Sequence, residues 1–319
     1  MREIIIGVDG GGTKTNVVAL DAANGQEVAR ATAGSINIYF GGMENAVANI
    51  KEALDALALD PADKILALAI GDPALDDSEA EGGGKFRSRV NSLVGEHVQC
   101  FSKSDVFMAL YGFTGGEPGA LLVAGTGSMG VGLKQHYRHG VFNPVLTVGG
   151  WGAPTTDPGS GNDIAIRGIC AAMDAFDGIG PETLLCEKVM DFYAVTEPRG
   201  LALILNDEAM TRTRIAAFSK CVAQCAEEGD AVSIGILNSA GTVLGKYACS
   251  LLEQIGGNAQ RIGVYGSVLV NNKQVYRMFA ETIKKKFPNA QIGIPAQPPE
   301  YGAARFAADA LGICWEESL

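Results

Sequence analysis

A carboxylate, three glycines and two threonines lie together near the start of the chain, where residues 9–15 read Asp-Gly-Gly-Gly-Thr-Lys-Thr. An apolar run over residues 4–8 precedes them and a β-branched run over residues 16–20 follows, which predicts a strand, a tight turn and a second strand. Glycines let the backbone approach a polyanion, and successive N–H groups in such a turn form an anion-binding concavity. With Asp9 beside it, the turn suits a metal–phosphate group.

Two commoner glycine motifs do not fit this stretch. A P-loop needs glycine immediately before Lys-Ser/Thr, whereas here Thr13 precedes Lys14 and Thr15. A dinucleotide-binding fingerprint should open a helix, whereas residues 16–21 predict a strand. On this stretch alone, a phosphate-binding hairpin and a plain glycine hairpin both remain open.

Two further glycine–hydroxyl turns follow apolar runs later in the chain. Residues 125–128 read Gly-Thr-Gly-Ser, and Gly266-Ser267 follows residues 261–265. Gly125, Gly127 and Gly130 match the bare G-x-G-x-x-G pattern, but no helix is expected after them and no acid lies about 20 residues on. Each half therefore opens with a strand, a glycine hairpin and more strands, which indicates an internal duplication. Two such hairpins facing each other across a cleft could hold the phosphates of a nucleotide.

The periodicity of apolar residues predicts the remaining elements. In the first half we expect three strands, a helix over 43–59, a strand over 65–70, another helix, a strand near 98–102 and a helix over 106–111. Residues 115–119, Gly-Gly-Glu-Pro-Gly, are the best domain boundary. In the second half we expect strands at 120–124, 129–135 and 145–148, helices at 163–176, 181–193, 207–227 and 231–255, a strand at 261–265, a helix at 274–287, a strand at 291–294 and a helix at 300–311.

Composition and charge exclude several classes of function. The length of 319 residues suggests two domains, and 47% apolar residues are enough for substantial cores. The net charge of −11 argues against nucleic acid as a main partner, because phosphate neutralisation needs basic patches. No apolar run approaches the roughly 20 residues of a membrane span. The chain enters a strand directly, without a signal-like core, so we expect a cytoplasmic protein without membrane partners.

The cysteines and histidines do not predict a metal centre. The seven cysteines are an odd number, and Cys221 and Cys225 are the only close pair. His97, His136 and His139 show no ligand spacing. We therefore interpret the cysteines as mostly buried small residues in a reducing cytoplasm.

Taken together, these motifs point to a family. The chain resembles the sugar kinase, heat-shock-70 and actin ATPase superfamily, and within it the BadF/BadG/BcrA/BcrD-type ATPase group that includes N-acetylglucosamine kinases. The resemblance implies an α/β fold of two similar ribonuclease H-like (actin-like ATPase) domains around a central cleft, each a mixed five-stranded sheet with helices. The domains would span residues 1–117 and 118–298, with a C-terminal helix within 299–319 packing back on the first.

The resemblance also implies an activity and a set of site residues. It implies an ATP-dependent kinase that phosphorylates the 6-hydroxyl of N-acetylglucosamine or of a related amino sugar, such as N-acetylmuramic acid or glucosamine. It further implies Mg²⁺ as cofactor, a homodimer, and small molecules as the only other partners. Asp105 matches the aspartate that serves the acceptor hydroxyl, and Asp9 would hold Mg²⁺ through water. Residues expected to contact the nucleotide are Asp9, Gly11, Gly12, Thr13, Lys14, Thr126, Gly127, Gly266 and Ser267. Residues expected to contact the sugar are Asn37, Ser128, Gly149, Gly150, Trp151 and Asp157.

Two departures from the family pattern leave the sugar open. Related kinases usually have Asp-Glu-Gly-Ser where residues 157–160 read Asp-Pro-Gly-Ser, and often asparagine where this chain has Met129. Both positions are expected near the sugar. A wider pocket for a substituted amino sugar is therefore one possibility.

Each candidate residue also has a plainer interpretation. Asp105 and Asp157 are plausible helix N-caps. Trp151 could belong to the core, and Asn37 could be a turn residue. Asp72 ends a strand near the expected cleft, but we interpret it as a turn residue.

Three other classes of function stay open from the sequence. An ATPase activator of a dehydratase would hold an iron–sulfur cluster between two subunits and needs well-placed cysteines, for which Cys221 and Cys225 are the only close pair. A non-catalytic sugar-binding regulator usually carries an added DNA-binding segment, which we do not find here. An actin-like polymer former would not need the Gly-Gly-Trp-Gly sequence at residues 149–152.

Overall fold

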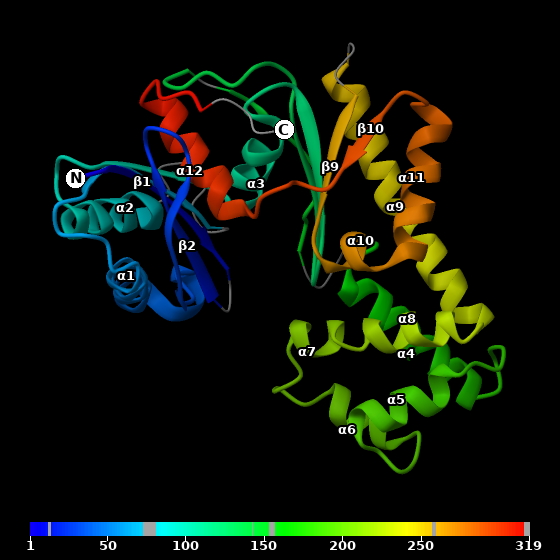
Figure 1. The fold of residues 1–319 in the computed structure, drawn as a ribbon. Coiled ribbons are helices and arrows are strands. Elements are labelled where there is room, and N and C mark those ends of the chain that lie inside the picture. The colour runs from blue at the N-terminus through cyan, green and yellow to red at the C-terminus, as the bar shows by residue number, and fades with distance from the viewer. Residues whose placement is uncertain (12–13, 73–80, 142, 153–156, 257–259, 316–319) are drawn as a thin grey trace. The chain divides into compact units, whose positions relative to one another are not determined.

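The computed structural model describes residues 1–11, 14–72, 81–141, 143–152, 157–256 and 260–315. They form two compact units, which are described separately (Figure 1). Unit 1 consists of Met1–Glu117, His136–Asn143 and Pro295–Leu319, and unit 2 consists of Pro118–Gln135 and Pro144–Ile294.

Unit 1 is built on a mixed five-stranded sheet in the order β3-β2-β1-β4-β5. Its strands are β1 (Glu3–Gly10), β2 (Lys14–Asp21), β3 (Glu27–Gly34), β4 (Lys64–Gly71) and β5 (Gln99–Lys103). β2 is antiparallel to β1 and β3, whereas β4 is parallel to β1 and β5. Because β1, β4 and β5 run in one direction, their carboxyl ends meet at one edge of the sheet. Asp9, Asp72 and Asp105 all lie at or just beyond these ends.

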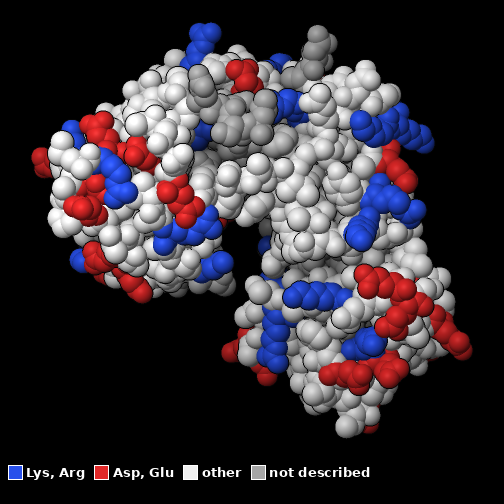
Figure 2. Space-filling view, viewed as in Figure 1, with Lys and Arg blue, Asp and Glu red and all other residues white. Residues whose placement is uncertain are grey.

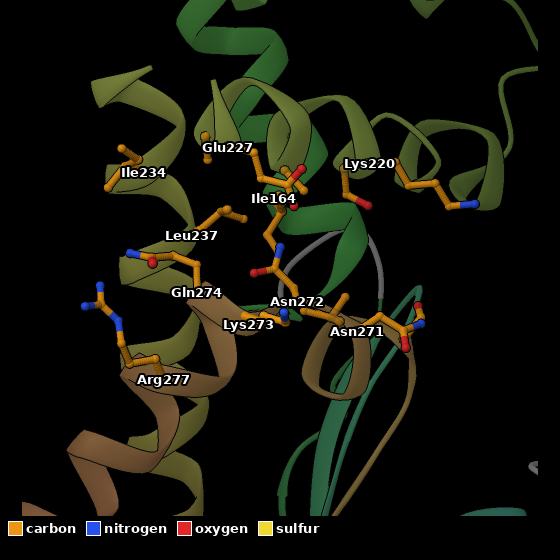
Figure 3. Close-up of a pocket in the computed structure, with 15 residues that line it drawn as sticks. Ile164, Lys220, Glu227, Ile234, Leu237, Asn271, Asn272, Lys273, Gln274 and Arg277 are labelled. Atoms are coloured by element: carbon orange, nitrogen blue, oxygen red, sulfur yellow. The ribbon is translucent and has the colours of Figure 1, made fainter. Parts of the chain in front are cut away.

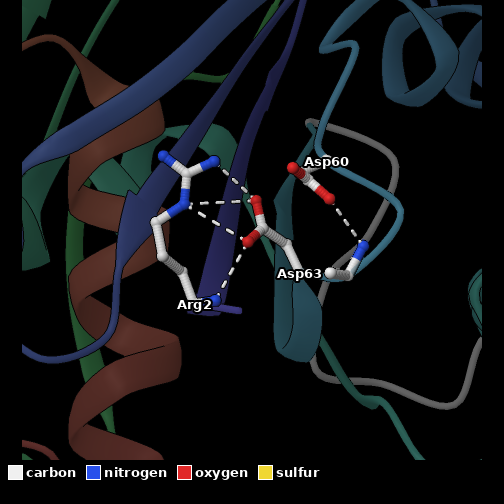
Figure 4. A network of polar contacts seen from close by, with 4 residues as sticks. Arg2, Asp60 and Asp63 are labelled. Carbon is white, nitrogen blue, oxygen red and sulfur yellow. Dashed lines mark hydrogen bonds and ion pairs between the residues drawn. The ribbon is translucent and has the colours of Figure 1, made fainter.

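An ion pair fastens the opposite edge of this sheet. The guanidinium Nη2 of Arg2, just before β1, donates to Oδ2 of Asp63, just before β4, at 2.6 Å, and the Arg2 amide donates to Oδ1 at 2.9 Å (Figure 4). Asp60 accepts a hydrogen bond from the amide of Ala62 at 2.8 Å and shapes the turn that presents Asp63. The Arg2 contact holds the pKa of Asp63 below its ordinary value. The parallel pair β1–β4 therefore begins in a defined register.

Helices cover both faces of the unit 1 sheet. On one face, α1 (Ile38–Ala56) and α2 (Glu81–Val94) pack Ile50 and Phe86 against Ile4, Ile6 and Val8 of β1. On the other face, α3 (Asp105–Thr114) and α12 (Pro299–Ala310) lie side by side (Figure 1). The final helix, α12, thus packs back on the first strand of the chain, β1, and also contacts β4.

An internal segment, His136–Asn143, also belongs to unit 1 rather than to the second domain in which the sequence had placed it. Tyr137 and His139 pack against Phe107 and Tyr111 of α3 and Phe306 of α12, with ring centroids 4.6–6.2 Å apart. Aromatic pairs at such distances add to the stabilisation from area burial alone. This cluster fixes α3, and with it Asp105, against α12.

Unit 2 repeats the sheet of unit 1. Its strands are β6 (Gly119–Ala124), β7 (Ser128–Leu133), β8 (Val145–Gly149), β9 (Arg261–Tyr265) and β10 (Gln291–Gly293), in the order β10-β9-β6-β7-β8. β7 is antiparallel to β6 and β8, and β9 is parallel to β6 and β10. Read from the opposite end, this is the strand order of unit 1, so the predicted duplication is confirmed.

The helices of unit 2 pack around a single large core. The long α9 (Ala231–Ile255) lies along the sheet and against α11 (Lys273–Lys286). The short α10 (Ser267–Asn271) follows β9 directly. The remaining helices are α4 (Gly161–Phe176), α5 (Leu185–Tyr193), α6 (Gly200–Leu205), α7 (Arg212–Ala216) and α8 (Ser219–Glu227).

Three predicted helices differ from those observed. The expected helix over 207–227 is two, because it breaks between α7 and α8 around Ala217 and Phe218, with Thr211 capping the first. The helix expected from residue 181 begins at Leu185. The helix predicted over 43–59 begins earlier, because residues 38–42 form the first turn of α1, and a kink at Gly42 separates them from the rest.

On the face of unit 1 that Figure 2 shows, charged side chains of both signs are interspersed. Within unit 2, Lys284, Lys285 and Lys286 gather basic charge in the last turn of α11, where cations interact favourably with the helix dipole. Among the described residues, no helix combines the length and hydropathy needed to cross a bilayer.

Candidate active site

Asp9 and Asp105 lie on one face of the unit 1 sheet. The β1–β4 register pairs Asp9 with Gly71, so both point to the same face. A Cβ placed on Gly71 would lie 3.1 Å from the Cα of Asp105. Glycine at this position therefore lets the amino end of α3 lie directly against the sheet, beside Asp9.

The helix-cap interpretation of Asp105 is wrong, because Ser104 occupies the N-cap position. The Ser104 hydroxyl accepts a hydrogen bond from the Phe107 amide at 3.3 Å. Asp105 is the first helical residue, and its Oδ1 accepts from the Val106 amide at 2.8 Å. Burial raises the pKa of Asp105, since a low-dielectric surrounding disfavours the charged carboxylate.

The environment of Asp9 strongly perturbs its carboxyl group. Burial, and next the negative charges of Asp105, Glu300 and Asp72, raise the pKa of Asp9 from its ordinary value of 3.8 to about 7, against an opposing effect of Lys14. A carboxyl crowded by other carboxyls is a site where a cation relieves repulsion.

Two of these acids were missed or discounted in the sequence. Asp72 is 1% exposed, and its Oδ2 lies 2.9 Å from where a Cβ on Gly10 would stand, so it belongs to the same edge rather than to an exposed turn. Glu300 is 3% exposed in the first turn of α12, and its Oε2 has no hydrogen-bond partner among the described residues. An acid in the first turn of a helix is ordinary in sequence, so nothing there pointed to Glu300.

The first glycine turn is described only in part. The Gly11 amide donates to the Lys14 carbonyl at 2.9 Å, and the Ser35 hydroxyl donates to the Gly11 carbonyl at 2.8 Å. Gly12 and Thr13, both predicted to contact phosphate, lie outside the described residues. Lys14 is exposed at the start of β2. The turn therefore closes the β1–β2 hairpin directly after Asp9.

Asn37 is held close to the same edge of unit 1. It is 4% exposed and immediately precedes α1, and its backbone N–H donates a hydrogen bond to the Ser35 hydroxyl at 3.2 Å. Its neighbour Ile36 lies 2.6 Å from where a Cβ on Gly10 would stand.

The second glycine turn, in unit 2, abuts the amino end of α4. The Gly125 amide donates to the Gly127 carbonyl at 2.9 Å, while the Gly161 and Asn162 amides donate to the carbonyls of Gly125 and Thr126 at 2.7 and 3.3 Å. The first amides of a helix are thus used to hold the turn in place.

Two predicted sugar contacts, Ser128 and Gly150, lie beside this turn. Ser128 is 3% exposed and donates to the Pro158 carbonyl at 2.8 Å, and its own carbonyl accepts from the Gly150 amide at 3.2 Å. Gly149 and Gly150 both have left-handed φ, 74° and 69°. Trp151 is 81% exposed, so its interpretation as a core residue is wrong.

Asp157 does not cap α4, because Ser160 does so by accepting from the Asp163 amide at 3.1 Å. Instead, Asp157 forms an ion pair with Arg212, at the start of α7, and its side chain is 6% exposed. Arg212 was not a candidate in the sequence, because the 54 residues between Asp157 and Arg212 were not expected to bring it back to the turn. Unit 2 therefore gathers Thr126, Gly127, Ser128, Gly150 and Asp157.

The third turn, Gly266-Ser267, borders a cavity of unit 2. Gly266 has φ 91°, and a Cβ there would clash with the Ala124 carbonyl at the end of β6, so the position requires glycine. The adjoining cavity, of about 670 Å³, lies between α8, α9, α10 and α11 (Figure 3). Its lining includes Ser267, Asn271, Lys220, Glu227, Gln274 and Arg277. The volume falls in the range of small-molecule pockets, roughly 300–1,000 Å³.

The surroundings of Cys221 and Cys225 do not favour metal binding. Cys225 is buried in the unit 2 core, where burial raises the pKa of its thiol to about 11, and burial also raises the pKa of Cys221. A protonated thiol is a poor metal ligand. In the part of the chain that the structure describes, no three histidine, cysteine or acidic residues are grouped as a metal cluster.

The fold is shared with solved sugar-kinase structures. A candidate N-acetylglucosamine kinase from Chromobacterium violaceum is 23% identical and superposes with a TM-score of 0.72 over 95% of this chain and 98% of that one. A ROK family glucokinase from Streptomyces griseus, solved with glucose and AMPPNP, is 16% identical with a TM-score of 0.58 over 96% and 99% of the two chains. At these identities the likeness shows the fold, and the predicted actin-like ATPase architecture is confirmed.

Sequence comparison then identifies the family. The BadF/BadG/BcrA/BcrD ATPase family matches residues 6–307, so the chain belongs to that family. An N-acetyl-D-glucosamine kinase from Dictyostelium discoideum is 29% identical over 96% of this chain and 98% of its own length. An N-acetylmuramic acid/N-acetylglucosamine kinase from Clostridium acetobutylicum is 26% identical over 95% and 97% of the two chains.

Proposed function

We propose that this protein is an ATP-dependent amino-sugar kinase that phosphorylates the 6-hydroxyl of N-acetylglucosamine or of a related sugar, N-acetylmuramic acid or glucosamine. The observation that carries the proposal is the placement of Asp9 and Asp105 together at the carboxyl edge of the unit 1 sheet. Full-length similarity to curated amino-sugar kinases supports the substrate class.

Asp9 is the proposed partner of Mg²⁺. A buried carboxyl surrounded by Asp72, Asp105 and Glu300 fits a divalent cation, because the cation would offset their mutual repulsion. Mg²⁺ usually keeps several waters and takes one or two carboxylates, so contact through water is consistent with the described residues. The ion, when bound, would neutralise charge on the transferring phosphoryl group.

Asp105 is the proposed general base. Its raised pKa brings the carboxyl closer to neutral pH, where a base both stays ionised and accepts protons effectively. It would accept the proton of the sugar 6-hydroxyl as that oxygen attacks the γ-phosphate, and ADP would leave. Its rigid position, set by Ser104 and by the aromatic cluster behind α3, supports in-line geometry.

Unit 2 is the proposed nucleotide-binding part. The amides of the turn at Thr126 and Gly127 would cradle the phosphates. In unit 1, Gly12, Thr13 and Lys14 are further proposed phosphate contacts, whereas the Gly11 amide is already bonded to the Lys14 carbonyl and would only shape the turn. The cavity beside Gly266 and Ser267 would take the adenosine. Its mixed lining of amides, aliphatic groups and cations is consistent with a base and ribose.

The proposed sugar contacts are Asn37, Ser128, Gly149, Gly150, Trp151 and Asp157. The exposed ring of Trp151 offers a flat apolar face of the kind that stacks on a sugar ring. The side chains of Ser128 and Asp157 already have partners within unit 2. We therefore propose that these two side chains shape this part of the site, and that the backbone groups beside them make most of the contacts to the sugar.

We also propose a cytoplasmic homodimer that uses only small molecules as substrates. Analytical ultracentrifugation of the purified chain tests the dimer. A single species at the monomer mass would exclude it.

Turnover on a sugar panel tests the proposed function. The chain is incubated with ATP, Mg²⁺ and N-acetylglucosamine, N-acetylmuramic acid, glucosamine or glucose, and the products are identified by mass spectrometry. We expect a sugar phosphate with at least one amino sugar and little with glucose. No phosphorylated product with any sugar would reject the kinase.

A further inference from the structure

Arg212 lies where the second glycine turn is expected to receive phosphates. It is the first residue of α7, a helix that begins there because the Thr211 hydroxyl caps it by accepting from the Arg214 amide at 3.3 Å. Its Nη2 forms the ion pair with Oδ2 of Asp157. All of these residues belong to unit 2.

The ion pair lies directly against the turn. A Cβ built on Gly127 would be 3.0 Å from Nη2 of Arg212 and 3.0 Å from Oδ2 of Asp157. A side chain at position 127 would crowd both of these groups. The guanidinium of Arg212 therefore lies next to the backbone of the turn at Gly127.

Arg212 retains the capacity to bind a further anion. A guanidinium has five N–H donors in a planar fork, and a single carboxylate oxygen uses only part of it. Nε of Arg212 is buried and has no hydrogen-bond acceptor among the described residues. One third of the side chain is still exposed. A buried donor without an acceptor is costly, so an incoming anion at this position would be stabilised.

Charge complementarity indicates which anion fits. Asp157 beside the turn would repel a polyphosphate if it stood alone, and Arg212 neutralises it. The ion pair holds the guanidinium next to the amides of the turn. The guanidinium and these amides can then donate hydrogen bonds to the same anion. Phosphate oxygens match such a fork better than a neutral hydroxyl does.

We propose that Arg212 binds the β- or γ-phosphate of the nucleotide at the second glycine turn, and that Asp157 is the positioning residue that orients its guanidinium. This inference rests on the proposed function only in taking a nucleotide as the ligand. It changes the predicted role of Asp157, from a sugar contact to a residue acting through Arg212.

Calorimetric binding of ADP and AMP to the full chain in the presence of Mg²⁺ tests this inference. The variants are Arg212→Gln and Arg212→Lys, with Arg214→Gln as matched control, because Arg214 lies on the same short helix and is exposed. Removing a charge-assisted contact to phosphate should weaken ADP binding by about 10- to 100-fold in Arg212→Gln. AMP binding should change little, Arg212→Lys should bind ADP with an affinity between those of the wild type and Arg212→Gln, and Arg214→Gln should match the wild type.

Two outcomes would overturn the inference. Unchanged ADP affinity in Arg212→Gln would show that the ion pair only fastens α7 to the turn. Equal weakening of ADP and AMP would show a general loss of structure, which the intermediate Arg212→Lys variant checks separately. If the wild type binds ADP as predicted but phosphorylates no sugar, the proposed kinase fails while Arg212 keeps its assignment. If the wild type turns over sugar and Arg212→Gln binds ADP normally, only this inference fails.

Discussion

Replacing Asp9 with asparagine is expected to stabilise the folded protein, and to do so more at alkaline than at acidic pH. Asparagine has nearly the shape of the neutral carboxyl but cannot ionise. The wild-type carboxyl must ionise in a buried position, and burial together with the negative charges of Asp105, Glu300 and Asp72 raises its pKa to about 7. The residue proposed to serve Mg²⁺ is therefore expected to lower the stability of the protein without ligands.

The magnitude follows from the difference between folded and unfolded pKa values. The folded chain holds the Asp9 proton more tightly than the unfolded chain, whose pKa is the ordinary 3.8. The free energy of unfolding therefore falls as the pH rises from 3.8 to about 7, and is flat above that. Each unit is worth about 1.4 kcal/mol, so the full cost is about 4 kcal/mol above pH 7 and about 2 kcal/mol near pH 5.5.

Urea unfolding of wild type and Asp9→Asn, without Mg²⁺ or nucleotide, measures this cost. The variant should be the more stable, and its advantage should grow by about 2 kcal/mol between roughly pH 5.5 and pH 8. An advantage that does not grow with pH would refute the reasoning, because it would show that the Asp9 carboxyl does not titrate in this range.

Other perturbations have equally defined outcomes. Asp105→Asn should lower kcat by about 10²- to 10⁴-fold while leaving ADP binding unchanged, and near-normal turnover would remove Asp105 as base. Gly266→Ala should lower the free energy of unfolding by about 2 kcal/mol or more, because of positive φ and the clash with Ala124, while the control Gly235→Ala, which meets open space, should lose nothing in the same urea titration. Ser160→Ala should cost about 1 kcal/mol by loss of the α4 cap, and unchanged stability would mean that another group caps the helix.

Much of the fold was predictable because local patterns and tertiary structure agree. The Asp-Gly-Gly-Gly and Gly-Thr-Gly-Ser turns marked the first hairpin of each unit, and their repetition indicated the shared strand order. The helix Ala231–Ile255 begins and ends where predicted, since Asp230 caps it and Gly256 follows it. Here the local signals and the packing place the same boundaries.

The remainder depends on contacts between distant parts of the chain. Glu300 joins the acids around Asp9 only because the final helix packs back on β1. Arg212 meets Asp157 only because the predicted long helix breaks before α8. His136–Asn143 belongs to unit 1 because Tyr137 and His139 enter an aromatic cluster from α3 and α12. None of these contacts has a local sequence signal.

The central claim is that ATP cleavage in this protein transfers a phosphoryl group to an amino sugar. The most direct measurement counts ADP and sugar 6-phosphate in the same reaction, with Mg²⁺ and with or without N-acetylglucosamine or the best sugar of the panel. We predict that ADP forms only slowly without sugar, and that with sugar one ADP appears for each 6-phosphate. ADP release that is the same with and without sugar, or that exceeds the sugar phosphate severalfold, would contradict the kinase and indicate an ATPase of another function.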